Sequence, residues 1–161
     1  MKRLCDPLME IARIGALFVP GDMFEQVMPP ERREYPLIVA GSTSQFAVSD
    51  EVDFMEDHFN ALKRVLLLTE RIDPERRPYA ALWIRRPENP SHGEVMVAGR
   101  ALPSEGCDIQ PLWPEILRAF SGLPTRRDRG CGETVYYPIR NSDEEIVGVL
   151  EITANVQPLF V

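Results

Sequence analysis

Residues 136–152 read YYPIRNSDEEIVGVLEI, and this stretch decides the fold class. Two runs rich in β-branched and aromatic residues flank a short polar segment, which is the pattern of a β-hairpin. The sequence therefore predicts an antiparallel strand pair over residues 133–140 and 145–153. Side chains alternate between the two faces of a strand, so we expect one face of the second strand to be core. That face would hold Ile146, Gly148, Leu150 and Ile152.

Upstream of this hairpin the sequence alternates between helix and strand signals. Asp6 followed by Pro7 is a typical helix start, and Ser49 followed by acidic residues is another. Apolar spacing predicts helices over residues 6–19, 22–28, 49–71 and 111–122. Further strands are expected over residues 34–40, 79–85 and 93–102, and a basic loop over residues 125–130. The fold class predicted is α+β, an antiparallel sheet of about five strands with helices packed on it.

Length and composition fit one globular domain. The 161 residues are 44% hydrophobic and 27% charged, which are ordinary values for a folded protein. We expect a single domain over residues 1–161, with the N-terminal helices of residues 5–28 as an interface element. The formal net charge of −7 repels polyanions, so no nucleic-acid partner is expected.

The residue composition also indicates in which cellular compartment the protein is expected. No run approaches the roughly twenty apolar residues of a membrane helix, and charged residues interrupt the N-terminal region where a signal peptide would be apolar. The three cysteines, Cys5, Cys107 and Cys131, are odd in number and widely spaced, which argues against a disulfide framework. We expect a cytoplasmic protein without membrane contact and without a structural metal, because no closely paired ligands occur. The sequence indicates no particular cofactor.

The C-terminal hairpin resembles the closing strands of the GAF, PAS and Cache sensory domains. In those families an apolar strand carrying proline leads into a basic residue and an acidic turn, and the next strand contains Val-Gly-Val. Here Pro138, Arg140 and residues 147–149 match that pattern. The resemblance implies a GAF/PAS-like sheet that binds a small molecule between sheet and helices and forms a homodimer through its N-terminal and long helices. The flavin motif Asn-Cys-Arg-Phe-Leu and a cyclic-nucleotide signature are absent, so no ligand carries over.

Two residues of this C-terminal region have a local interpretation as ligand contacts. Gly148, inside a strand, permits close approach of a ligand, a ring or another backbone; the alternative is a bulge or a packed aromatic ring. Cys131 lies between two glycines near several arginines, which favour a reactive thiolate. The alternative is a tight loop with an inert cysteine.

The aromatic residues and histidines complete the list of candidates. Tyr79, Trp83 and Tyr137, together with Trp113, would line one side of the sheet and form a pocket for a small apolar ligand, or would simply be core. His58 on the long helix and His92 in a loop are each more typical of a boundary or solvated residue than of a ligand.

The sequence thus favours a non-catalytic sensory or regulatory domain that binds a small molecule or transduces a signal through dimerisation. Two alternatives remain open. One is a protein-interaction module without a ligand, and the other is a small cysteine-dependent enzyme that uses Cys131.

Overall fold

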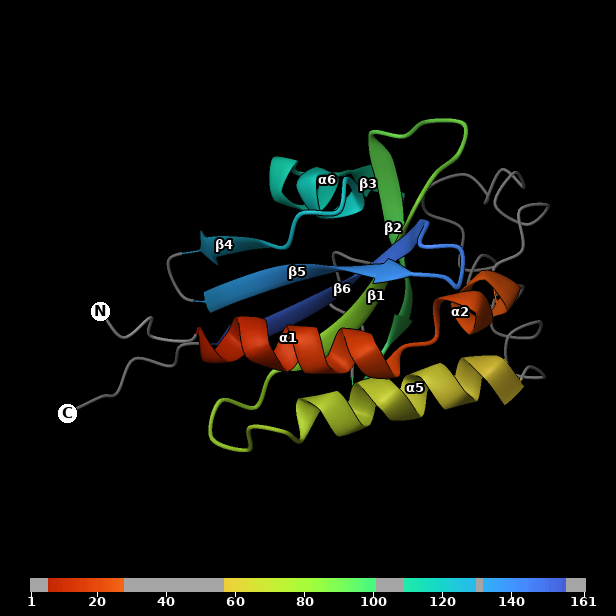
Figure 1. Cartoon of the computed structure of the whole chain (residues 1–161). Helices are drawn as coiled ribbons and strands as arrows, with labels where there is room; N and C mark the ends of the chain where they lie inside the picture. Colours follow the sequence, from red (N-terminus) through yellow and green to blue (C-terminus); the bar gives the residue numbers. More distant parts are fainter. Residues whose placement is uncertain (1–5, 28–56, 101–108, 130–131, 156–161) are drawn as a thin grey trace, which may run out of the picture.

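The computed structural model describes residues 6–27, 57–100, 109–129 and 132–155 (Figure 1). These ranges contain the helices α1 (Pro7–Phe18), α2 (Gly21–Val27), α5 (Asp57–Glu70) and α6 (Pro114–Phe120). They also contain the strands β1 (Tyr79–Arg85), β2 (His92–Ala98), β3 (Gln110–Pro111), β4 (Thr125–Arg129), β5 (Gly132–Arg140) and β6 (Ile146–Asn155). None of the helices in these ranges is long and apolar enough to cross a membrane.

The strands form one antiparallel sheet in the order β3-β2-β1-β6-β5-β4. The predicted C-terminal hairpin is confirmed, because β5 pairs with β6. The strands expected over residues 79–85 and 93–102 are present as β1 and β2, which pair with each other. The α+β class is confirmed too, but the described sheet has six strands rather than about five. The strand predicted over residues 34–40 and the first part of the helix predicted from Ser49 lie outside the described residues.

Two predictions between β2 and β5 were wrong. Residues 125–129 form the edge strand β4 and not a loop. Its sequence TRRDR lacks apolar alternation, and it is held by backbone pairing to β5 and by ion pairs from Arg126 to Asp6, Asp128 and Glu133; charged residues are common on edge strands. The last helix begins at Pro114 and not Pro111, since Gln110 and Pro111 pair with the start of β2.

Helices cover the sheet on both sides, as Figure 1 shows, with α1, α2 and α5 on one face and α6 on the other. Each face has its own apolar cluster, so the expectation of a single core face was incomplete. Under α1, α2 and α5 the cluster includes Leu8, Ile11, Phe24, Leu62, Leu66, Leu82, Ile84, Leu150 and Ile152. Under α6 it includes Trp83, Leu112, Ile116, Phe120, Tyr136 and Val149.

A β-bulge near the start of β6 changes which face its residues occupy. Ile139 pairs with Gly148 and Arg140 pairs with Ile146, so Val147 is an extra residue in β6. Ile146 consequently packs against the α6 cluster, while Val147 joins the cluster beneath α1, α2 and α5. The prediction that Ile146 shares a face with Leu150 and Ile152 was therefore wrong, because regular alternation does not hold across a bulge.

Gly148 is a point of close contact between β6 and α2. A Cβ atom at this position would lie 2.4 Å from Cε1 of Phe24 and 3.1 Å from the carbonyl oxygen of Trp83. The Phe24 side chain is fully buried. Of the readings that the sequence allowed for Gly148, the packed aromatic ring next to a bulge is the one observed.

Substitution Gly148→Ala should destabilise the protein by about 1 to 3 kcal/mol, the usual cost of overpacking a core. The added methyl group would meet Phe24, whose buried ring has no solvent to move into. Urea denaturation measures the change, and Phe24→Leu provides the second background for a double-mutant cycle. The alanine should cost less in the Phe24→Leu background; an equal cost in both backgrounds would contradict the proposed contact.

Candidate functional site

Trp83 and Trp113, two of the predicted site residues, lie together on the α6 face of the sheet. Their ring centroids are 6.0 Å apart and the rings meet edge to face. The indole N–H of Trp113 donates to the Tyr136 hydroxyl at 2.8 Å, and that of Trp83 donates to Glu151 Oε2 at 2.6 Å. Trp83 is only 3% exposed, so this cluster has the character of core with satisfied polar groups.

The other predicted aromatic residues do not join this cluster. Tyr137 follows Tyr136 in the same strand, and its side chain packs against the opposite core, beneath α1, α2 and α5. Placing it on the Trp83 face was wrong, since neighbours in a strand point to opposite faces. Tyr79 is half-exposed at the end of β1, with the Arg100 guanidinium 4.4 Å from its ring centre. Tyr79, Trp83 and Tyr137 therefore do not line one pocket.

The remaining predicted residues give no site in the part of the chain that is described. Cys131 lies outside the described residues. His58 is half-buried on α5, and His92 is the first residue of β2 rather than a loop residue. Within the described ranges no three His, Cys, Asp or Glu side chains gather as a metal site would require.

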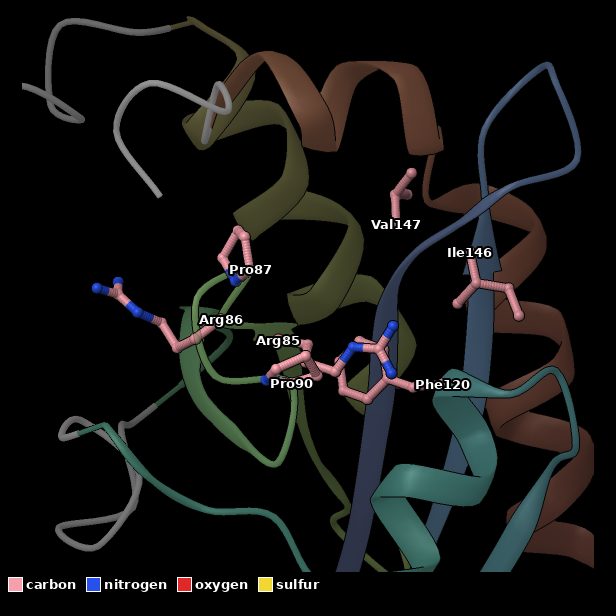
Figure 2. Close-up of a pocket in the computed structure, with 7 residues that line it drawn as sticks. All are labelled: Arg85, Arg86, Pro87, Pro90, Phe120, Ile146 and Val147. Carbon is pink, nitrogen blue, oxygen red and sulfur yellow. The ribbon is translucent and has the colours of Figure 1, made fainter. Parts of the chain in front are cut away.

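A pocket that the sequence did not predict lies at one end of the sheet (Figure 2). Its volume is about 240 Å³, and its walls come from the β1–β2 loop, the end of α6 and the bulge of β6. The bulge brings two consecutive apolar side chains, Ile146 and Val147, to this place. The lining residues are Arg85, Arg86, Pro87, Pro90, Phe120, Ile146 and Val147.

The two adjacent arginines of the pocket play different roles, and Figure 2 shows their side chains pointing in opposite directions. Arg86 is 2% exposed and pairs with Glu94 at 3.1 Å and with Glu88 at 2.6 Å. Burial raises the pKa of Glu94, against the lowering effect of the Arg86 charge. Arg86 is therefore a buried structural cation whose charge is compensated.

Arg85 instead presents its charge to the pocket. Its side chain is exposed, and its guanidinium carbon lies 5.4 Å from the centre of the Phe120 ring, within cation–π range. Among the described residues Arg85 makes no ion pair with a carboxylate. Phe120 is nearly buried at the end of α6 and holds the guanidinium against an apolar wall.

Arg140 places a second guanidinium close to Ile146, since both side chains lie next to Gly122. Arg140 Nη2 is 3.0 Å from the point where a Cβ of Gly122 would be, and Ile146 Cδ1 is 3.3 Å from the same point. Gly122 has a φ of 97°, which favours glycine, so the space stays open to Arg140. Arg140 Nη1 donates to the Glu144 carbonyl oxygen at 2.7 Å, and no carboxylate pairs with it in the described part of the chain.

Comparison of the chain with protein-family models, curated proteins and solved structures finds no match. The chemistry of the pocket must then be inferred from its own side chains. None of its seven lining residues can act as a nucleophile or a general base. A guanidinium beside an aromatic ring and prolines is suited to binding a ligand, not to catalysing a reaction.

The Glu94 carboxyl should make stability depend on pH. Its pKa is raised above the ordinary 4.5 in the folded protein, so just above pH 4.5 the folded protein binds more protons than the unfolded chain. The contribution of Glu94 to the free energy of unfolding then falls as the pH rises through this window. In urea denaturation, the stability of the native protein minus that of Glu94→Gln should decrease as the pH rises.

Glu88→Gln is the matched control, because the pKa of Glu88 is lowered by hydrogen bonds to its own backbone N–H and to Arg86. Its contribution should be lost as the pH falls, which is the opposite sign. A Glu94 difference that stays constant or increases with pH would show that burial does not dominate at this carboxyl.

Proposed function

We propose that this chain is a non-catalytic sensory or regulatory domain of the GAF/PAS-like kind. It binds a small molecule in the pocket of Arg85 and Phe120 and passes the change on through pairing of two copies. The observation that carries the proposal is the exposed guanidinium of Arg85 held against an apolar wall that has no catalytic group. The antiparallel sheet with helices on it and the sequence of the last hairpin are further support.

The proposed pairing surface lies on α1 and α5, which cover the face of the sheet opposite to α6. Leu17 and Phe18 at the end of α1 are 73% and 66% exposed, and Leu68 on α5 is 63% exposed. Close packing of Gly15 against Thr69 brings α1 and α5 together. The three exposed residues follow or precede this contact by only a few positions. We call Leu17, Phe18 and Leu68 the α1–α5 surface; exposed large apolar side chains of this kind are typical of interaction sites.

The two sites are connected through the bulge of β6. Val147 lines the pocket and also belongs to the core beneath α1, α2 and α5. The next residue, Gly148, is in direct contact with Phe24 of α2. A ligand that moves Val147 can therefore change the packing of the helices, and a close-packed core transmits such a shift.

A second candidate is a protein-interaction module without a ligand, which the exposed α1–α5 surface also favours. In both cases we place the domain in the cytoplasm, because its three widely spaced cysteines suit a reducing compartment.

Native mass spectrometry of the protein purified from its own host separates the two candidates. We expect a dimer that carries a small-molecule adduct. Ile146→Trp, whose larger ring fills the pocket, should remove the adduct and keep the dimer. Leu17→Ser with Phe18→Ser should give a monomer that keeps the adduct. Leu123→Ser is the control, because Leu123 is 62% exposed and belongs to neither site.

A ligand-free dimer or a co-purified protein would favour the interaction module over the sensory domain. A ligand-free monomer would contradict both. Thermal denaturation of each variant verifies that it is folded.

A further inference from the structure

We infer that the ligand of the pocket is a small organic acid, whose carboxylate pairs with Arg85 and whose apolar body lies against Phe120 and Ile146. This inference names the ligand class of the proposed function and rests on it. Three features of the pocket carry it: the Arg85 charge, which pairs with no carboxylate of the described residues, the apolar walls and the size.

The charge at the pocket is opposite to that of the whole protein. The chain has a net charge of −7, yet the arginines around Phe120 and Ile146, Arg85 and Arg140, make no carboxylate pair among the described residues. The neighbouring acidic groups Glu88 and Glu94 are both engaged by Arg86. A planar guanidinium binds a carboxylate through two parallel hydrogen bonds, so the carboxylate of a small acid suits Arg85.

The walls define the rest of the ligand. Phe120, Ile146 and Val147 are buried or half-buried apolar residues, and Pro87 and Pro90 form the outer rim. These side chains offer no hydrogen-bond donor or acceptor to a polar body. The body of the ligand should therefore be a ring or a short hydrocarbon.

The size of the pocket limits the ligand to a small molecule. The pocket volume is about 240 Å³. It lies below the roughly 300 to 1,000 Å³ of most ligand pockets. A benzoate-sized acid fits this space, whereas a dinucleotide or a haem does not.

A titration of the ¹⁵N-labelled protein with benzoate, followed by its amide NMR signals, tests the inference. Benzamide is the matched neutral probe, since it has the same ring and lacks the charge. We expect benzoate to shift the signals of Arg85, Phe120, Ile146 and Val147, and to bind at least about tenfold more tightly than benzamide. Arg85→Gln should weaken benzoate binding about tenfold, and Arg140→Gln should weaken it less.

Arg118→Gln is the control for loss of a positive charge, because Arg118 is an exposed residue of α6 that does not line the pocket. It should leave benzoate binding unchanged. Equal binding of benzoate and benzamide, unchanged affinity in Arg85→Gln, or no shift of the pocket signals would each overturn the inference.

Failure of this inference can be separated from failure of the proposed function. A neutral adduct in native mass spectrometry that Ile146→Trp removes would overturn the acid class and leave the ligand-binding function in place. If no adduct is found and neither benzoate nor benzamide shifts the NMR signals, the acid class and the ligand-binding function are both overturned.

Discussion

The central strands β1 and β6 are covered by helices on both faces, and the rest of the structure depends on this constraint. β1 is buried from Ala80 to Ile84, and β6 packs against α1 and α2 on one side and α6 on the other. Such strands must be apolar on both faces. Polar groups here are tolerated only when paired, as Glu151 is with the Trp83 indole. Room for a ligand is consequently found at the end of the sheet, where α6 stops and the β1–β2 loop begins.

Much of the fold could be predicted from the sequence, because β1, β2, β5 and β6 carry β-branched and aromatic residues between clear turn signals. β4 could not be predicted, since its arginines show no apolar alternation and only its pairing with β5 makes it a strand. The bulge at Val147 could not be predicted from the sequence either. It depends on register with the partner strand, which no single strand reveals.

The candidate site was harder to predict than the fold. The aromatic residues chosen from the sequence include true neighbours, Trp83 and Trp113, but Trp83 is buried in the core and the half-buried Trp113 packs against it. The pocket combines residues from three segments, and Arg85 and Arg86 are indistinguishable in sequence. Their difference arises from strand geometry, which directs Arg86 towards Glu94 and Arg85 towards Phe120. A pair of arginines followed by a proline was the one local signal in the sequence, and it does not reveal which arginine faces a pocket.

The proposed regulatory function requires that the pocket and the α1–α5 surface influence each other across the sheet. The bulge provides the contact, because Val147 touches the pocket while Gly148 supports Phe24 of α2. By thermodynamic linkage, an acid that favours one packing of the helices must change the affinity between two copies, and pairing must change the affinity for the acid by the same factor.

The most direct test of this account is the dimer dissociation constant measured by sedimentation velocity with and without saturating benzoate. Coupling between the pocket and the α1–α5 surface predicts that benzoate shifts the constant severalfold and that Arg85→Gln abolishes the shift. A dissociation constant that is the same with and without bound benzoate would contradict it.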